Sequence, residues 1–489
     1  MTEQAQSNFD SMFGTMNLPE EVHIVKQEMK EVHIMPKMLP LTIHEQRIRE
    51  QMEKAQREKK WVLTFVIGTK PCFYKFYGSI MEAERQGIPY MVIDSNQHYD
   101  ANLTFGIKEF DYSRKICSNL SIRGNLSQKS GELFYKVSWF ANYLKNNWPD
   151  VTVVPVVLGD TILTSIVPAA WMFTRREKAI HNEAGLRSMS PDAMALLRNH
   201  QTLSAEDFID KQFNGSWSLQ TQEPFPEQWD TFVSSKGSEF LFAPLDLNKQ
   251  HLLREGHNEK KIWVTGGVVV DALEAKSKMT SERSVFDIYP ILEQGEWIRV
   301  DIHRKANQTP ERFKSIISGI KQLVEKGHQV NFIEMNTTRV SLDQYGLRGV
   351  LDGLKNYDNF LHTSVWPEFS HVLEFYKSKN CFAALTDSGG VQEEMNLLGK
   401  LCLTARFNTD RPETVNSAHS NILVPPVSGD FMLKMVEHVL QNQTLQQKMR
   451  SAPKLYGEGV GKKFITTVKG LMEQNAKPFT WTHDQWGLL

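Results

Sequence analysis

Short apolar, β-branched runs alternate with helix-forming stretches along most of this 489-residue chain. In the first half such runs occupy 61–67, 89–94 and 151–158, and helical stretches at about 75–86 and 131–146 separate them. Short buried strands that alternate with helices are typical of a parallel, doubly wound sheet. Ligands of such sheets bind at the carboxyl ends of the strands, so the polar residues that directly follow each strand are the candidates for a site.

A second α/β unit begins near Trp297. Its predicted strands and helices alternate as 297–302, 310–326, 329–334, 367–378 and 381–385. The stretch 189–222 breaks the rhythm of the first unit, and we interpret it as an insertion or a mobile loop over the cleft. Residues 1–58 precede both units, and their charged, helix-forming part at 44–60 is interpreted as a solvated surface helix or an oligomer contact.

Composition excludes several classes of protein. The 56 Lys and Arg residues nearly balance the 57 acids, which argues against a protein that mainly coats nucleic acid or an acidic membrane. The four cysteines lack CxxC spacing, so a reducing compartment is a simpler prediction than a disulfide framework or a zinc site. The N-terminus lacks a signal-peptide pattern, and Pro and Gly interrupt the most apolar stretch at 151–173. We therefore predict a cytoplasmic protein without a membrane span.

The strongest local signal is LTDSGGVQEE at 385–394, where a strand ends, a Ser388-Gly389-Gly390 turn follows and a helix begins. Small residues at a helix N-terminus let backbone N–H groups and the helix dipole meet a phosphate. Glu394 lies one turn into that helix, where it is placed to accept hydrogen bonds from ribose hydroxyls. The alternative is a tight strand–helix turn with Ser388 as its N-cap.

Cations follow three other predicted strands, at places that suit a diphosphate. These candidate binding residues are Lys70 and Lys75, His303 and Arg304, and Arg411 with its neighbour Glu413. A His beside cations stabilises a leaving diphosphate, and the Arg411 segment is expected to close the cleft over a substrate. Taken singly, each of these is more often a solvated cation or a loop histidine.

Three carboxylates stand at predicted strand ends or loop starts: Asp160, Glu183 and Glu227. Carboxylates that meet in one cleft have their pKa values pushed apart, which leaves one as an acid and another as a base. Each taken singly is more often an N-cap or a surface carboxylate. Three of them after successive elements predict acid–base chemistry.

Together these segments resemble the UDP-N-acetylglucosamine 2-epimerase family, and they occur in that family's order. The matching segments are GTKP at 68–71, SNQHYD at 95–100, LGDTILT at 158–164, HNEAGLRS at 181–188, PFPEQW at 224–229, VTGGVVVDAL at 264–273, IHRK at 302–305, LTDSGGVQEE at 385–394, DRPE at 410–413 and LYGEG at 455–459. The resemblance covers roughly residues 60–475, and LTDSGGVQEE and HNEAGLR are its most specific pieces.

The resemblance implies an α/β fold of GT-B type, with two Rossmann-like domains facing across a cleft. Their expected limits are 59–280, including the insertion, and 281–455, and a helix within 456–489 returns to the first domain. The implied reaction is epimerisation at C2 of UDP-N-acetylglucosamine (UDP-GlcNAc) to UDP-N-acetylmannosamine (UDP-ManNAc), through elimination and re-addition of UDP. It calls for no cofactor and no metal, and it implies a homodimer.

Residue roles follow from the same resemblance. Asp160, Glu183 and Glu227 match the family's catalytic acids, and His303 matches its histidine on the diphosphate side. The nucleotide-binding positions are matched by Lys70, Lys75, Ser388, Gly389, Gly390, Glu394 and Arg411. Gln97 and His98 match positions that touch a second, allosteric UDP-GlcNAc in bacterial members.

The sequence also departs from the family. Lys70 replaces an Arg, and Thr231 and Ala306 stand where an Arg and a Glu are expected. Residues 334–336 read Glu-Met-Asn where the family has Pro-Val-His. These changes keep two alternatives open: a hydrolysing 2-epimerase that releases UDP and free ManNAc, and a GT-B glycosyltransferase that uses a UDP-sugar donor and the insertion to admit an acceptor. Nucleic acid is expected as a partner only as such an acceptor, and the intact acids argue against a silent binding protein.

Overall fold

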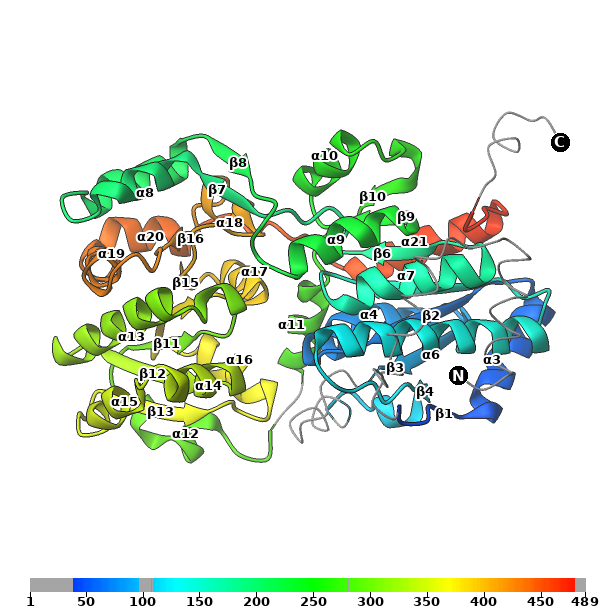
Figure 1. The fold of residues 1–489 in the computed structure, drawn as a ribbon, viewed down its shortest axis with the longest axis horizontal. Coiled ribbons are helices and arrows are strands. Elements are labelled where there is room, and N and C mark those ends of the chain that lie inside the picture. Colours follow the sequence, from blue (N-terminus) through cyan, green and yellow to red (C-terminus); the bar gives the residue numbers. More distant parts are fainter. Residues whose placement is uncertain (1–37, 96–106, 108, 279–280, 480–489) are drawn as a thin grey trace, which may run out of the picture. The chain divides into compact units, whose positions relative to one another are not determined.

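The structure is a computed structural model that describes residues 38–95, 107, 109–278 and 281–479. The chain divides into two units, Met1–Leu39 and Pro40–Leu489. Only two residues of the first unit are described, so the following account concerns the second. It contains two large sheets, which with their helices form an N-terminal lobe and a C-terminal lobe (Figure 1).

The sheet of the N-terminal lobe has eight strands in the order β1-β4-β3-β2-β5-β6-β9-β10. Their bounds are β1 Thr42–Ile43, β2 Val62–Ile67, β3 Tyr90–Asp94, β4 Ile116–Asn119, β5 Val153–Leu158, β6 Ala179–Asn182, β9 Ser238–Ala243 and β10 Ile262–Val264. Every pairing is parallel except that of β1 with β4. The carboxyl ends of the parallel strands therefore lie along one edge.

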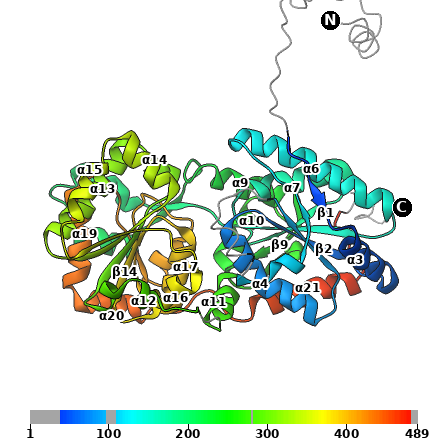
Figure 2. The same cartoon turned by 90° about the horizontal axis from the view of Figure 1, so that it is seen from below.

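Helices cover both faces of this sheet (Figure 2). The side chains of β2 alternate between the two faces, since Leu63 and Phe65 join one core and Val62 and Val66 join the other. The first core is covered by α4 (Lys70–Arg85), α11 (Val269–Ser277) and α21 (Val460–Glu473). The second is covered by α3 (Glu45–Glu58), α6 (Leu126–Asn147) and α7 (Ile162–Arg175), and α9 (Glu227–Lys236) packs on α7. Burial on both faces explains why β2 and β5 are continuous apolar runs.

Two terminal segments join this lobe. α21 packs against α4, although it follows the whole C-terminal lobe in sequence. At the other end, β1 pairs with β4, and α3 buries Ile48, Met52 and Ala55 against the sheet. The interpretation of residues 44–60 as a solvated helix is therefore wrong for one of its faces, because its few apolar residues recur at helical spacing and pack into the core.

The sheet of the C-terminal lobe is wholly parallel, in the order β13-β12-β11-β14-β15-β16. Its strands are β11 Trp297–Asp301, β12 Gln329–Glu334, β13 Phe360–Ser364, β14 Cys381–Thr386, β15 Leu401–Thr404 and β16 Asn421–Leu423. Its helices are α12 Val285–Ile288, α13 Pro310–Glu325, α14 Asn336–Gln344, α15 Arg348–Leu354, α16 Phe369–Lys377, α17 Gly389–Leu398, α18 Pro412–Asn416, α19 Gly429–Gln441 and α20 Gln443–Arg450. The α/β fold with two Rossmann-like domains is confirmed.

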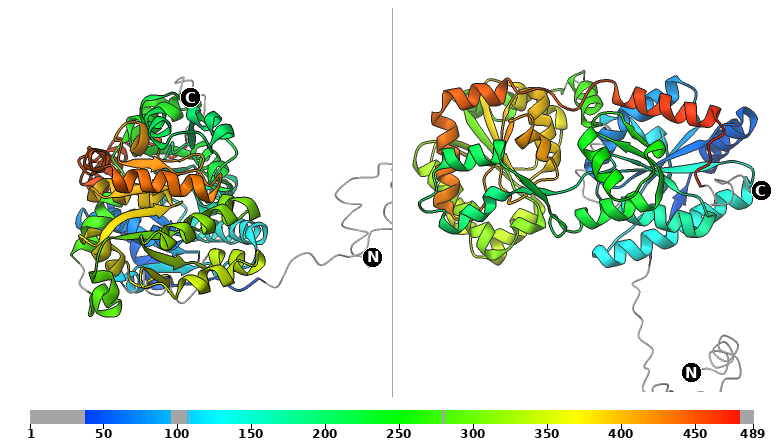
Figure 3. Two further views of the ribbon diagram at one scale, coloured as in Figure 1. Left: turned by 90° about the vertical axis from the view of Figure 1, so that its left-hand side faces the viewer. Right: turned by 90° about the horizontal axis from the view of Figure 1, so that it is seen from above.

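The insertion 189–222 is folded, and it packs on the C-terminal lobe although it leaves from the N-terminal one (Figures 1 and 3). It contains β7 Met189–Pro191, the 3₁₀ helix η2 Asp192–Asn199, α8 Ala205–Asn214 and β8 Trp217–Leu219. α8 buries Phe208 and Ile209 in the same core as α13 and α19. Its Gln212 amide donates to the carbonyl of Leu423 (3.0 Å) and accepts from the N–H of Leu423 (2.8 Å), which satisfies the edge strand β16.

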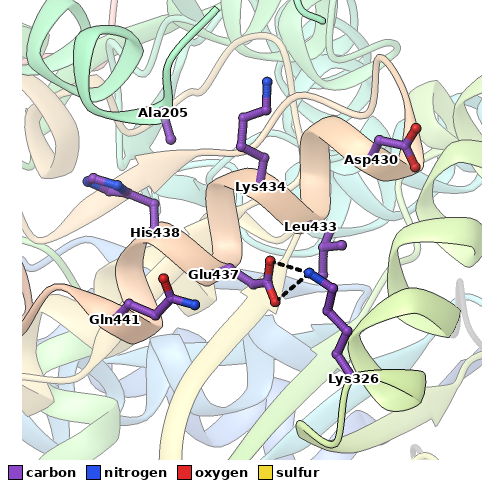
Figure 4. Close-up of a pocket in the computed structure, with 8 residues that line it drawn as sticks. All are labelled: Ala205, Lys326, Asp430, Leu433, Lys434, Glu437, His438 and Gln441. Atoms are coloured by element: carbon purple, nitrogen blue, oxygen red, sulfur yellow. Dashed lines mark hydrogen bonds and ion pairs between the residues drawn. The ribbon is translucent and has the colours of Figure 1, made fainter.

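Lys434 on α19 anchors the insertion from the other side, beside the groove in Figure 4. Its ammonium donates to the carbonyls of His200, Gln201 and Leu203 at 3.0 to 3.3 Å. The prediction of a mobile loop over the cleft is therefore wrong. Apolar residues at helical spacing in α8 allow it to complete a core, and that pattern outweighs the polar composition of the segment.

The apolar stretch 151–173 is the strand β5 followed by most of α7, as predicted. Among the residues that the structure describes, no helix is long and apolar enough to cross a membrane.

Candidate active site

The predicted site residues lie at the carboxyl edges of both sheets. Asp160 and Glu183 follow β5 and β6 of the N-terminal lobe, and His303 and Ser388 follow β11 and β14 of the C-terminal lobe. Glu227 begins α9. Ion pairs between side chains of the two lobes bring these groups together.

The first group of charges surrounds Glu183. The Lys75 ammonium, on α4, donates to both carboxylate oxygens of Glu183 at 2.8 and 3.0 Å, and it lies 3.9 Å from Glu393 on α17 of the other lobe. Burial opposes the charge of Lys75, but the two carboxylates outweigh it and raise the pKa of Lys75. Burial also raises the pKa of Glu183, which Lys75 offsets only in part.

The backbone holds Glu183 in an unusual conformation. Its φ of 61° lies in the left-handed region, which costs a non-glycine residue about 1 kcal/mol or more. The side chain of Asn182 accepts from the N–H of Glu183 at 3.0 Å and supports this turn. A Cβ on Gly159 would stand 3.1 Å from Glu183 Oε2, so the glycine makes room for the carboxyl group beside the Asp160 segment.

The second group of charges surrounds Glu227. Arg304 Nη1 donates to Glu227 Oε1 at 2.5 Å, and Arg304 Nη2 lies 4.0 Å from Asp410. Asp160 faces the same charges: burial raises the pKa of Asp160, Arg304 lowers it, and Asp410 and Glu227 raise it further. The predicted acids of the N-terminal lobe therefore meet a predicted cation of the C-terminal lobe.

Asp230, one turn after Glu227 on α9, was not among the predicted residues. It is fully buried, and the Ser165 hydroxyl donates to its Oδ1 at 2.5 Å. Its Oδ2 has no hydrogen-bond partner. Burial raises the pKa of Asp230 to about 7, against the smaller effect of the Ser165 bond.

The backbone turn that carries His303 is held by Asp387, a second residue that the sequence reasoning missed. The buried carboxylate of Asp387 accepts from the backbone N–H of His303 at 3.0 Å and of Arg304 at 2.9 Å, and from the Asn307 amide at 3.0 Å. The His303 Nδ1 lies 3.2 Å from Asp387 Oδ1. One carboxylate thus fixes the turn after β11 and lies close to the imidazole, whose Nδ1 makes no hydrogen bond.

The turn Ser388-Gly389-Gly390 at the start of α17, called the cradle below, follows β14. Ser388 occupies the N-cap position, but its hydroxyl makes no capping bond, so the simple N-cap alternative is not what the structure has. A Cβ on Gly389 would lie 2.7 Å from Asp410 Oδ2, which explains the glycine. The N–H groups of the first turn have no partners within the helix, and together with the helix dipole they suit a phosphate.

Arg411 is buried beside this cradle. Its guanidinium pairs with Glu393 and, at 2.8 Å, with Asp410. Glu413 accepts from the Tyr456 hydroxyl at 2.7 Å, and burial raises the pKa of Glu413 to about 7. Burial likewise raises the pKa of Glu394 to about 7, and the nearby Lys276 lowers it in part.

Three predicted residues lie partly or wholly outside the described part of the structure. Lys70 begins α4, but its side chain lies outside the described part of the structure. Gln97 and His98 lie wholly outside the described residues. Among those that are described, no group of His, Cys, Asp and Glu side chains is arranged to hold a metal ion.

Several residues that organise the site escaped the sequence reasoning. Asp387, Glu393 and Asp410 stand inside the segments LTDSGGVQEE and DRPE, so their position next to the predicted residues was a usable signal. Asp230 and Asn307 carry no such signal, because only the packing of α9 on α7 and the fold of the turn after β11 give them their surroundings.

Two Rossmann-like lobes, whose strand ends meet through ion pairs between charged side chains, define a GT-B-type protein. The family model described as UDP-N-acetylglucosamine 2-epimerase matches residues 214–468, and the chain belongs to this family.

Known relatives agree with this assignment. UDP-N-acetylglucosamine 2-epimerase of Methanocaldococcus jannaschii is 29% identical over 405 residues, which are 81% of this chain and 95% of that protein. The protein of the same name from Methanococcus maripaludis is 26% identical over 416 residues, 82% of this chain and 96% of the relative. The crystal structure of the M. jannaschii enzyme in complex with UDP-GlcNAc and UDP has a TM-score of 0.66 at 28% identity, and covers 84% of this chain and 99% of its own. The resemblance inferred from the motifs is confirmed.

Proposed function

We propose that this protein is a UDP-GlcNAc 2-epimerase that interconverts UDP-GlcNAc and UDP-ManNAc through elimination and re-addition of UDP. The observation that carries the proposal is the pairing of acids with cations at the strand ends: the buried Glu183 with Lys75, and the partly exposed Glu227 with Arg304. The similarity to an enzyme structure that contains UDP-GlcNAc and UDP supports the choice of ligand.

The proposed chemistry divides the acids by their surroundings. The C2 proton has to leave from one face of the sugar and return to the other, which requires two acid–base groups. Glu183 and Glu227 belong to different ion-pair groups and are assigned these roles, with Asp160 between the charges of the second group. Burial raises the pKa values of Asp160 and Glu183 toward the working pH, as proton transfer requires.

The departing UDP is assigned to the C-terminal lobe. His303, held by Asp387, and Arg304 stabilise the charge that develops on the diphosphate. The remaining contacts are assigned to the cradle and its neighbours: Lys70, Lys75, Ser388, Gly389, Gly390, Arg411 and Glu413 for the phosphates and the closed cleft, and Glu394 for the ribose. None of these steps requires a cofactor.

The experiment that tests the proposal is NMR of the purified protein with UDP-GlcNAc in D₂O. Deuterium at C2 of both UDP-GlcNAc and UDP-ManNAc supports the epimerase. Deuterated free ManNAc with UDP supports the hydrolysing enzyme instead. UDP binding without exchange contradicts both, and leaves the transferase, which a screen of UDP-sugars with acceptors tests.

A homodimer is proposed as well, through α6 and α7. These two helices pack against each other and expose Tyr135, Trp139 and Phe173 to 61%, 42% and 71%, so both present large aromatic side chains to solvent. Sedimentation equilibrium is expected to give twice the chain mass of 56.2 kDa, and Phe173→Asp is expected to shift the measured mass toward that of the single chain.

A cytoplasmic location is proposed because all four cysteines are buried and unpaired.

A further inference from the structure

Lys75 has two candidate partners, the Glu183 carboxylate and the diphosphate of the nucleotide. In the structure its ammonium donates to both oxygens of Glu183, at 2.8 and 3.0 Å. The ammonium also lies 3.9 Å from Glu393 on α17, the helix that begins with the cradle, so Lys75 is a candidate ligand of the diphosphate. A diphosphate carries more charge than one carboxylate and offers several strong acceptors, so it competes for the same three N–H donors.

Glu183 has little else to stabilise its charge. It is 2% exposed, so water does not replace Lys75. The other groups that face it are the Glu393 carboxylate on α17, the Arg411 guanidinium before α18 and the Tyr74 phenol on α4, which burial keeps neutral. Arg411 is already paired with Glu393 and Asp410. A Glu183 carboxylate that loses Lys75 therefore stands next to a second carboxylate and a bound phosphate.

We propose that the diphosphate of the nucleotide draws Lys75 away from Glu183, and that Glu183 then takes up a proton from the solvent. One proton moves to a carboxylate oxygen and no covalent bond to the ligand changes. The nucleotide thereby converts Glu183 into the acid that the reaction needs to return a proton to C2. This inference rests on the proposed function for the identity of the ligand, and it adds how the site is protonated.

The proposal predicts proton uptake of up to one per UDP bound. The uptake occurs between the pKa of Glu183 in the free site and its higher pKa in the complex. Within this window the affinity for UDP falls as the pH rises, by up to about tenfold per pH unit. Below it Glu183 is protonated already, and above it Glu183 stays ionised in both states, so the slope disappears on either side.

Titration calorimetry with UDP, in two buffers of different ionisation enthalpy, measures the uptake. The titration is repeated at several values from about pH 7 to 9, where the terminal phosphate of UDP stays largely ionised, since such phosphates titrate near pH 6. The wild-type protein is expected to take up a substantial fraction of a proton. Glu183→Gln is expected to take up none and to bind UDP several-fold more tightly, because Lys75 no longer has a carboxylate to leave.

The exposed Glu458→Gln is the control, because Glu458 lies outside both groups of charges and its loss should leave the uptake intact. UDP binding without proton uptake, or uptake that survives in Glu183→Gln, overturns the proposal and leaves the proposed function standing. The pH dependence of the wild-type affinity gives the same answer if Glu183→Gln does not fold. Absence of UDP binding in the wild-type protein overturns both.

Discussion

The two lobes are built on similar sheets, but carboxylates that follow their strands differ in the number of hydrogen-bond donors around them. In the C-terminal lobe, Asp387 accepts from two backbone N–H groups and a side-chain amide. In the N-terminal lobe, Glu183 is equally buried and Asp160 is only partly buried. Both have fewer donors, and burial raises their pKa values. Asp230 and Glu227 each keep one oxygen without a hydrogen bond.

This difference separates positioning from chemistry. A carboxylate with several fixed donors keeps a defined geometry, which suits a residue that holds the turn of His303. A buried carboxylate with few donors exchanges protons more readily, which suits an acid or a base. Asp387 is therefore assigned to positioning and Glu183 to proton transfer, although the C-terminal lobe also contains buried carboxylates with raised pKa values, Glu394 and Glu413.

The largest effect is expected from an acid of the N-terminal lobe. Glu183→Gln removes a proton carrier and keeps the shape of the side chain, so kcat should fall about 10²- to 10⁴-fold. Epimerisation followed by NMR measures the rate. The exposed Glu458→Gln serves as the control and should be unaffected. A rate near that of the wild-type protein would remove Glu183 from the chemistry.

The second prediction concerns the packing of the insertion 189–222 in the core of the C-terminal lobe. Phe208→Ala empties a fully buried site in a core that α8 shares with α13 and α19, and should lower the free energy of unfolding by about 3 kcal/mol. Val340→Ala, at a side chain on α14 that is 61% exposed, should cost less than about 0.5 kcal/mol. Urea unfolding compares them, and equal losses would contradict the placement of the insertion in that core.

Asp387→Asn tests the positioning role of Asp387. The amide cannot accept all the bonds that the carboxylate does, so His303 and Arg304 should shift, and kcat/KM should fall about 10²-fold. Because both residues are assigned to the diphosphate, the affinity for UDP should fall as well. An effect on kcat alone, with UDP binding intact, would erase the distinction between Asp387 and Glu183.

A smaller effect concerns stability and pH at Asp230. The folded protein keeps the proton of Asp230 up to about pH 7, whereas an unfolded Asp titrates near 3.9. The folded state binds more protons between these values, so this contribution to stability falls as the pH rises from about 4 to 7.

Asp230→Asn should remove that loss. Relative to the wild-type protein, the variant should gain about 2 kcal/mol in free energy of unfolding between pH 5 and pH 8. Urea unfolding at both pH values measures this gain, and the exposed Asp150→Asn should show none. A pH-independent difference would mean that Asp230 is ionised in the folded protein at both pH values.

Much of the fold was predictable because it depends on local patterns. The predicted strands 61–67, 89–94 and 381–385 match β2, β3 and β14 to within one residue at each end. Helix starts were less accurate: α4 begins at Lys70, where Pro71 suits the first turn, and α6 begins after a capping box at Asn125. The polar composition of 189–222 led to the wrong prediction of a mobile loop, because polar residues surround the apolar face of α8 in the sequence.

The sequence by itself determined the two parallel sheets, the strand ends that carry the site and the family, because short apolar runs and glycine turns act through neighbouring residues. Only the tertiary structure decided which charges meet. Lys75 and Glu183 are 108 positions apart, and Arg304 and Glu227 are 77 apart. Their protonation depends on burial and on these distant partners, and a linear sequence contains neither. The packing of the insertion also depends on distant residues, so only the fold shows that it leaves the N-terminal lobe and packs on the C-terminal lobe.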